Sequence, residues 1–279
     1  MEHRLPDRFL HNPIRIHVVG CGGTGSQLIP GLVALHKTLV ALGHPHGLEV
    51  TVWDADAVAE HNCIRQNFFL PDVGRNKAEV MVNRINLAHA ASGIRWQAEP
   101  RMFGREALAL DWGDRSGCTL RGDFVIGCVD STAARAAILD VVMSCHTDIY
   151  WLDCGNSSDS GQFVAGEWHG GSALGHGERL PLVSEFFPEI VQAGKNDDSP
   201  SCSAVQSIQR QGVVTNRFAA TLALSWLDEA LRQGRVGWNG AFFNIKAGRV
   251  TPIPVDPAAW ARMGVREPTV APAAERIAA

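Results

Sequence analysis

Short apolar runs and amphipathic segments alternate along this chain, and the alternation predicts its secondary structure. Uninterrupted apolar runs are typical of strands buried on both faces, and longer segments with apolar residues at helical spacing are typical of helices that cover a sheet. Strands are therefore predicted near residues 14–20, 48–54, 94–99, 123–128, 148–154 and 161–166. Helices are predicted near residues 25–42, 77–90, 132–145 and 204–233.

This order of strands and helices predicts a Rossmann-like, doubly wound α/β fold, in which a mostly parallel sheet carries helices on both faces. Ser157 to Gly161 are turn residues between the last two predicted strands, so the final strand is expected to extend the sheet in the antiparallel direction. Residues 241–245 and 249–255 are expected to form a closing hairpin.

The chain of 279 residues is long enough for one large α/β domain. Residues 168–203 are rich in Gly, Pro, Ser and Asp, and so long an irregular connection is usually functional or mobile. We therefore expect a single domain over residues 1–255 with a long crossover loop at about 168–203. Residues 256–279, with their prolines and alanines, are expected to form a flexible C-terminal tail.

Charge and hydropathy narrow the functional classes. A net charge of −4 argues against nucleic-acid binding through a basic surface. No segment reaches the roughly 18 uninterrupted apolar residues of a membrane-spanning helix, and residues 1–12 carry no apolar signal-peptide core. We therefore expect a cytoplasmic protein that acts neither on nucleic acid nor in a membrane.

The seven cysteines follow no disulfide or metal pattern. None lies in a C-x-x-C pair, so neither a disulfide framework nor a structural zinc site is expected. Cys21 and Cys63 are interpreted as small packing residues, and Cys128 and Cys154 as buried residues of apolar strands.

A glycine-rich turn directly follows the first predicted strand. Gly20, Gly22 and Gly25 match the G-x-G-x-x-G pattern, with Gly23 inside it. Such glycines allow a tight turn, a close approach of the backbone to phosphates, and close packing of the next helix on its strand. The positive end of that helix faces an anion, so the motif predicts nucleotide binding without saying which nucleotide.

Charged residues beyond the glycines narrow that choice. Asp54 ends the second strand about where an acidic residue binds ribose hydroxyls, and to this point an NAD- or FAD-linked oxidoreductase fits equally well. Hydride transfer builds no charge on phosphates, whereas reaction at a triphosphate does, and Arg65 and Lys77 can offset it. Solvated surface charge is the alternative for both. Their spacing with Asn62 and Gln66 favours a functional role.

Asp130 ends another buried strand, at the edge where open α/β sheets bind ligands. A carboxylate there can hold Mg²⁺ together with phosphates, because Mg²⁺ prefers a few protein oxygens plus phosphate and water. Alternatively, Asp130 caps the helix that starts near Thr132. We favour the metal role.

Together these motifs resemble the adenylation domains of the ThiF/MoeB and ubiquitin-activating-enzyme superfamily. Such domains carry a glycine-rich loop, D-x-D, N-x-x-R-Q, a lysine before the next helix and a strand-end aspartate. The resemblance covers roughly residues 14–166 and 200–228. The matching residues after the glycines are Asp54 and Asp56, Asn62, Arg65 and Gln66, Lys77, and Asp130.

The resemblance implies a role for each matching residue. Asp54 would bind ribose, with Asp56 beside it in the nucleotide site. Arg65 and Lys77 would bind phosphates. The remaining polar residues would frame the nucleotide (Asn62 and Gln66) or associate with Mg²⁺ (Asp130).

The resemblance also implies an activity: ATP- and Mg²⁺-dependent formation of an acyl-adenylate on the C-terminal carboxylate of a ubiquitin-like protein. More narrowly, the chain is similar to the ThiF-like family of the bacterial PRTRC gene system. That system also includes a small ubiquitin-like protein, a conjugating-enzyme-like protein and a JAB-type peptidase-like protein. The first of these is the implied substrate, and the second is a candidate acceptor of the acyl group.

Related small adenylation domains pair, so a homodimer is expected. Arg4 or Arg8 could reach a neighbouring subunit's phosphates, although the N-terminal arm is shorter than in dimeric relatives. The apolar segment 218–231 is one candidate part of the interface, with core packing as the alternative.

Cys202 lies at the end of the crossover loop, before a predicted helix. A helix N-terminus lowers the pKa of a thiol and favours the nucleophilic thiolate. In the superfamily this segment can carry or adjoin a catalytic cysteine, so Cys202 is a candidate for thioester formation. A structural thiol is the alternative, because many relatives act without a thioester.

Two rival functions stay open. An NAD- or FAD-linked oxidoreductase explains the glycines and Asp54 but leaves Arg65, Lys77 and Asp130 without a role. A catalytically silent scaffold subunit of a heterodimeric activating enzyme would retain the fold. Such subunits tend to lose the arginine, lysine or aspartate, and all three are present here.

Overall fold

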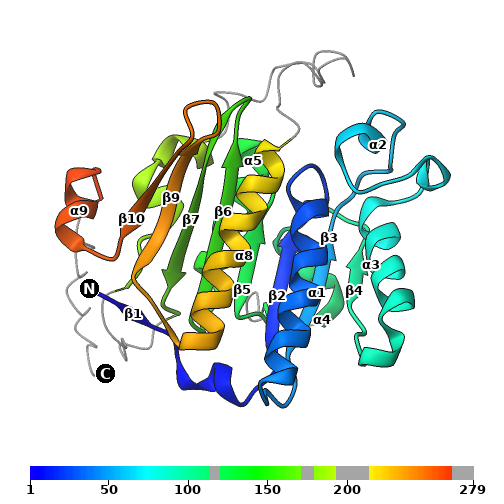
Figure 1. Ribbon diagram of the computed structural model, residues 1–279, viewed down its shortest axis with the longest axis horizontal. Helices are drawn as coiled ribbons and strands as arrows, with labels where there is room; N and C mark the ends of the chain where they lie inside the picture. The colour runs from blue at the N-terminus through cyan, green and yellow to red at the C-terminus, as the bar shows by residue number, and fades with distance from the viewer. Residues whose placement is uncertain (113–119, 171–178, 193–213, 266–279) are drawn as a thin grey trace, which may run out of the picture.

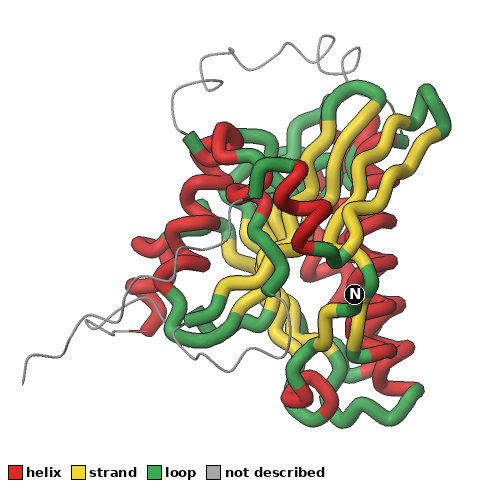
Figure 2. The backbone as a smooth tube through the Cα atoms, turned by 90° about the vertical axis from the view of Figure 1, so that its left-hand side faces the viewer, coloured by secondary structure: helices red, strands yellow, loops and turns green. Residues whose placement is uncertain are grey.

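The computed structural model describes residues 1–112, 120–170, 179–192 and 214–265. Its centre is an eight-stranded sheet with helices on both faces (Figures 1 and 2). The strand order is β10-β9-β7-β6-β5-β2-β3-β4. The strands are β2 (Ile14–Val19), β3 (Leu48–Trp53), β4 (Gln97–Glu99), β5 (Phe124–Gly127), β6 (Ile149–Asn156), β7 (Ser160–Trp168), β9 (Trp238–Asn244) and β10 (Arg249–Pro254).

The sheet has a parallel half and an antiparallel half. Strands β4, β3, β2, β5 and β6 pair in parallel. From β6 onward, β7, β9 and β10 pair antiparallel, which includes the expected closing hairpin. The α/β class, the mostly parallel sheet and its antiparallel extension are thus confirmed.

Helices cover both faces of the sheet and pack their apolar sides against its buried residues. Helices α1 (Gly25–Ala41), α3 (Lys77–Ala88) and α8 (Thr215–Gln233) share one face, where α1 contacts both of the others. Helices α4 (Arg105–Trp112) and α5 (Thr132–Ser144) lie on the opposite face. Within α8, Ala219, Ala223, Trp226 and Leu227 are buried, so segment 218–231 packs mainly in the core rather than forming a free interface.

The core is centred on β5 and β6. Every residue of β5 is buried, as are residues 149–154 of β6. The rings of Phe124 and Tyr150 stack with centroids 5.1 Å apart, and Phe9 packs against both. This aromatic cluster lies at the amino ends of β5 and β6, opposite the carboxyl ends where the candidate site lies.

Several short elements are not predicted from the sequence, because each is too short to show a helical or strand periodicity. Strand β1 (His3–Arg4) pairs with β8 (Arg235–Val236) and ties the N-terminus to the end of α8. The other short elements are η1 (Asp7–Leu10), α2 (Asn62–Arg65), η2 (Leu70–Asp72), η3 (Ala90–Ser92), α6 (Val183–Phe186) and η4 (Pro188–Val191).

The structure corrects two expectations about irregular segments. Part of the expected crossover loop is helical: α6 (Val183–Phe186) packs on β7, and η4 (Pro188–Val191) packs on α5. The expected tail begins with helix α9 (Pro257–Arg262), which Asp256 caps by accepting the Ala258 N–H. Trp260 of α9 is buried, and its indole N–H donates to Asn239 Oδ1 at 3.1 Å. A proline in the first turn after a capping aspartate favours a helix rather than a flexible tail.

Candidate functional site

A cavity of about 770 Å³ opens at the carboxyl ends of the parallel strands. Its walls come from the turn after β2, the segment after β3, the start of α3 and the end of β5. The structure brings most of the candidate residues together here, namely Gly20, Gly22, Gly23, Asp54, Asp56, Asn62, Arg65, Gln66, Lys77 and Asp130. Cys202 lies outside the described residues.

The glycine-rich turn has the geometry that its sequence predicts. Gly20 has φ +92°, a conformation that L side chains rarely adopt, and its N–H donates to the Trp53 carbonyl at 2.8 Å. A Cβ on Gly25 would collide with the Gly20 carbonyl oxygen, so only glycine permits this entry into α1. Gly25 therefore shapes the turn without lining the cavity.

Asp54 links the end of β3 to the glycine-rich turn. Its carboxylate accepts the Cys21 N–H at 2.6 Å and the Asp56 N–H at 2.9 Å. Burial raises the pKa of Asp54, while these two hydrogen bonds oppose the rise. The carboxylate is thus fixed beside the place where a nucleotide would meet the turn.

Lys77 reaches the cavity from the first residue of α3 and is only 7% exposed. Its Nζ lies 2.7 Å from Asp56 Oδ2, whose side chain is 69% exposed. Asn76 caps α3 by accepting the Glu79 N–H, and its Nδ2 donates to the Asp54 carbonyl at 2.7 Å. Asn76 is a positioning residue that the motifs do not single out.

The segment around α2 carries the N-x-x-R-Q residues. Asn62 Oδ1 accepts the Ala59 N–H at 2.8 Å, so Asn62 shapes this loop as well as lining the cavity. The side-chain oxygen of Gln66 is buried and has no hydrogen-bond partner within the described chain. Arg65 lines the cavity beside them.

Asp130 is an exposed carboxylate at the cavity edge, and it does not cap α5. The cap is Ser131, whose Oγ accepts the Ala134 N–H at 3.1 Å. Arg135 donates to the Asp130 carbonyl at 3.4 Å and pairs through Nε with Asp153 Oδ1 at 3.0 Å. Burial raises the pKa of Asp153, and the Arg135 guanidinium opposes that rise.

The model of the ThiF family matches residues 10–251, which is most of the chain. The chain belongs to the ThiF family. Among curated proteins, a sequence search gives no match.

Solved structures show that the ThiF-family chain shares its fold with larger proteins. Escherichia coli MccB with AMPCPP and MccA is 15% identical with TM-score 0.57, covering 94% of this chain and 66% of MccB. PaaA is 15% identical with TM-score 0.52, covering 87% of this chain and 64% of PaaA. The chain thus spans less than two thirds of the length of these relatives.

The cavity also has aromatic residues that the sequence motifs do not include. The rings of Trp53 and Phe103 meet edge to face with centroids 5.2 Å apart, and the Arg101 guanidinium lies 5.7 Å from the Trp53 centroid. All three residues line the ThiF-family cavity. Aromatic groups at a cavity wall can contact a nucleobase.

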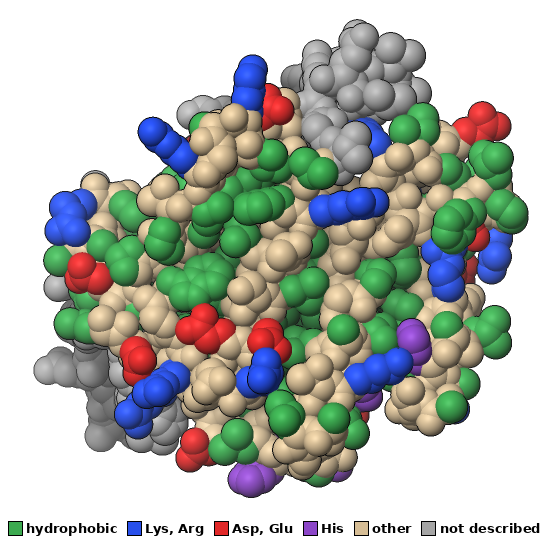
Figure 3. Space-filling view, in the orientation of Figure 1, with side chains coloured by type: hydrophobic (Ala, Val, Ile, Leu, Met, Phe, Trp, Pro, Cys, Tyr) green, Lys and Arg blue, Asp and Glu red, His purple; other side chains and the backbone are tan. Residues whose placement is uncertain are grey.

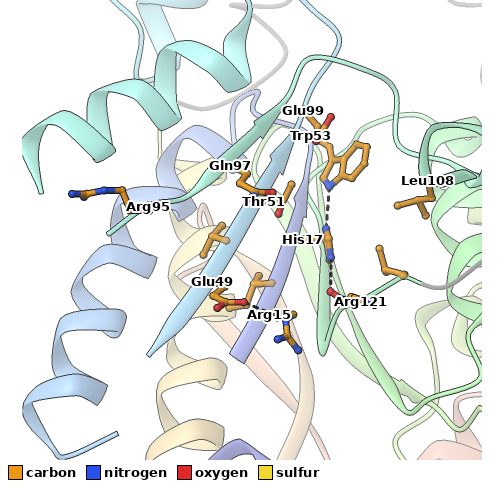
Figure 4. Close-up of a pocket in the computed structure, with 13 residues that line it drawn as sticks. Arg15, His17, Glu49, Thr51, Trp53, Arg95, Gln97, Glu99, Leu108 and Arg121 are labelled. Carbon is orange, nitrogen blue, oxygen red and sulfur yellow. Dashed lines mark hydrogen bonds and ion pairs between the residues drawn. The ribbon is translucent and has the colours of Figure 1, made fainter. Parts of the chain in front are cut away.

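A second cavity, of about 520 Å³, lies between α4 and strands β2 to β4 (Figure 4). His17 stands between Trp53 and Arg121: Trp53 Nε1–H donates to His17 Nδ1 at 3.1 Å, and His17 Nε2 lies 3.3 Å from the Arg121 carbonyl. Burial lowers the pKa of His17 to about 4. His17 is therefore a neutral ring that holds the Trp53 indole by a hydrogen bond.

Three cysteines surround the glycine-rich turn of the ThiF-family cavity. Cys128 is partly exposed and lines the cavity, which differs from the expected burial. A hydrogen bond with Cys154, together with burial, raises the pKa of Cys128. Burial and the Asp54 carboxylate raise the pKa of Cys21. Both thiols thus stay protonated near neutral pH and are poor nucleophiles.

Other features of the surface bear on partners. On the face seen in Figure 3, Lys and Arg side chains are interspersed with Asp and Glu. Among the described helices, none is long and apolar enough to cross a membrane. The Arg8 guanidinium contacts Asp123 and the Asp148 carbonyl of its own chain, at the amino ends of β5 and β6.

Proposed function

We propose that this ThiF-family chain is an ATP-dependent adenylyltransferase that activates the C-terminal carboxylate of a ubiquitin-like protein. A carboxylate oxygen attacks the α-phosphorus of ATP, the bond from that phosphorus to the β-bridging oxygen breaks, and pyrophosphate leaves. The products are an acyl-adenylate and pyrophosphate. The enzyme positions the two substrates and offsets the charge that develops on the phosphates.

The observation that carries this proposal is one cavity that joins the glycine-rich turn to two cationic side chains. Arg65 and Lys77 both line the cavity that the turn forms. Asp56 holds the Lys77 ammonium group within that cavity before any nucleotide arrives. An oxidoreductase would leave these two cations without a task.

The fit to ATP extends beyond the phosphates. Trp53 and Phe103 offer a base an aromatic wall, and Asp54 is fixed where ribose hydroxyls would lie. MccB, whose fold this chain shares, has been crystallised with ATP. These features support ATP over a nucleotide bound only through its phosphates.

The site also suits Mg²⁺ held jointly with phosphates. The described residues contain no group of three or more metal-type side chains, but Asp130 presents one carboxylate to the cavity. One or two carboxylates plus phosphate oxygens are the usual ligands of protein-bound Mg²⁺. Bound in this way, Mg²⁺ would neutralise phosphate charge, and Asp130 is the residue that we propose holds it.

The finer assignments follow the resemblance to the PRTRC system. We propose a small β-grasp protein as the substrate and a conjugating-enzyme-like protein as a candidate acceptor. The enzyme would be a cytoplasmic homodimer. A thioester on Cys202 would be an optional second step after adenylation.

ATP–pyrophosphate exchange tests the activity. The purified chain is assayed with a panel of small β-grasp proteins, and we expect exchange only when the correct partner is present. Lys77→Met should lower the exchange rate by about 100-fold or more, because it removes charge at the phosphates while keeping side-chain length. The fold should survive, since the released Asp56 carboxylate is already exposed.

The matched control is Lys37→Met, on an exposed position of α1 outside the cavity, which should exchange at the wild-type rate. Wild-type exchange by Lys77→Met would remove the proposed role of that lysine. Tight NAD binding without ATP binding would overturn the adenylation proposal as a whole.

A further inference from the structure

A cluster of amide and hydroxyl groups joins the glycine-rich turn to the start of α8. At its centre is Asn216, which is 5% exposed and lines the cavity. The adenylation motifs assign it no role. Its partners are Thr24, 192 residues away in the turn, and Asn156 at the end of β6.

These partners fix the orientation of the Asn216 carboxamide. Thr24 Oγ1–H donates to Asn216 Oδ1 at 3.2 Å, and Asn156 Nδ2–H donates to the same oxygen at 2.7 Å. In this arrangement the atom between the two donors is the carbonyl oxygen of Asn216. The amide NH₂ of Asn216 consequently points elsewhere.

That NH₂ group lies against the glycine-rich turn. A Cβ on Gly23 would collide with Asn216 Nδ2, so the amide takes the space that a side chain would fill. Nδ2 has no hydrogen-bond partner within the described part of the chain. A donor that lines a cavity and has no partner within the protein is available to an acceptor on a ligand.

We propose that Asn216 donates a hydrogen bond from Nδ2 to a phosphate oxygen of the nucleotide bound in this cavity. This inference rests on the proposed function, since it deepens the nucleotide site of that function. Thr24 and Asn156 are positioning residues, because they hold the carboxamide by its oxygen. The phosphate contact thus comes from α8, and residues of the turn and of β6 hold it in place.

The Asn216→Asp variant tests whether Asn216 donates to a ligand or only accepts hydrogen bonds from Thr24 and Asn156. Aspartate keeps an oxygen for Thr24 and Asn156 but replaces the NH₂ group with a second acceptor. If Asn216 only accepts hydrogen bonds from Thr24 and Asn156, any loss of ATP affinity should come from repulsion by the new carboxylate and should disappear at high salt. If Nδ2 contacts phosphate, ATP binding should weaken by about tenfold or more.

The measurement is ATP affinity by calorimetry, with melting temperature recorded for each variant. We expect an unchanged melting temperature and a loss of affinity that persists at high salt, because screening weakens remote repulsion but not a lost contact. Asn244→Asp is the control: Asn244 Oδ1 also accepts a hydrogen bond, here from the Ala247 backbone N–H at 2.8 Å, yet Asn244 lies outside the cavity. It should bind ATP as the wild type does.

Two failures can be told apart. If the wild type binds ATP but exchanges pyrophosphate with no partner, adenylation is wrong, while weaker ATP binding by Asn216→Asp would still support the phosphate contact. If Asn216→Asp binds ATP within twofold of the wild type, the contact is overturned whatever the exchange assay gives. A wild type that binds no ATP would overturn both.

Discussion

At the scale of single residues, the candidate site is held by contacts between its own charged and polar groups. Asp56 pairs with Lys77, Asp54 binds two backbone N–H groups, and Asn76 ties α3 to the end of β3. Such contacts fix side chains before a ligand arrives, so less ordering is left to the binding step. The sequence motifs single out Asp54, Asp56 and Lys77 but not Asn76.

His17 supplies a prediction at this scale. Because burial lowers its pKa to about 4 from an ordinary 6.5, the unfolded chain takes up a proton below pH 6.5 that the folded chain does not. The free energy of unfolding should therefore fall as pH drops through this window. Between pH 7 and pH 5 the contribution is at most about 2 kcal/mol.

Urea denaturation at pH 7 and pH 5 measures this effect. His17→Gln removes the titrating ring, so its stability should fall less between the two pH values than that of the wild type. His46→Gln, at an exposed position, should keep the wild-type difference. An equal fall in His17→Gln and wild type would mean that His17 is protonated in the folded chain.

At the scale of elements, the sequence predicts those with a long or distinctive pattern. The apolar run before Gly20 and the glycine pattern together specify β2, the turn and the start of α1. Helix α9 escaped prediction because Pro257 and its alanines suggest a flexible segment, although Asp256–Pro257 is also a helix-start signal. Strand β1 escaped because two residues carry no period.

The same reasoning explains which site residues were found. Arg65, Gln66 and Lys77 lie within motifs of fixed spacing, so their convergence on one cavity is readable from the chain. Asn216 meets Thr24 only because α8 packs beside α1. No local pattern reports that contact, since it depends on the packing of segments far apart in sequence.

Helix α9 gives a prediction at the element scale. Trp260 is 4% exposed and its indole N–H is bonded to buried Asn239, so Trp260→Ala leaves a cavity and an unpaired amide. We expect a loss of about 3–5 kcal/mol in the free energy of unfolding, measured by urea denaturation. Arg262→Ala, in the exposed last turn of the same helix, should change stability by less than about 0.5 kcal/mol. Equal stability of the two variants would mean that α9 adds nothing to the fold.

At the scale of the whole molecule, one edge of the sheet gathers segments from most of the chain. The turn after β2, the α2 segment, the end of β5 and the start of α8 all reach the same cavity. At the opposite end of the strands, β1 pairs with β8, and Arg8 contacts Asp123 and the Asp148 carbonyl. Under the proposed function, a protein partner would bring its C-terminus to the carboxyl ends of the strands, where the cavity opens.

The proposed homodimer leads to a prediction about a protruding part of this edge. In α2 and the segment that joins it to α3 (Figure 1), four large apolar side chains are exposed within ten residues: Ile64, Phe69, Leu70 and Val73. Monomers rarely expose so many apolar groups together, and twofold pairing is the commonest way to cover them. Light scattering should give about twice the chain mass of 30.1 kDa.

Phe69→Asp combined with Leu70→Asp should convert that dimer to a monomer, because two carboxylates cannot be buried unpaired in an apolar contact. Val250→Asp, which places a carboxylate at another exposed apolar position on β10, should leave the dimer intact. Melting temperatures of all variants separate loss of pairing from loss of the fold. A wild-type mass near that of one chain, with pyrophosphate exchange intact, would show that the adenylation site is complete within a single subunit.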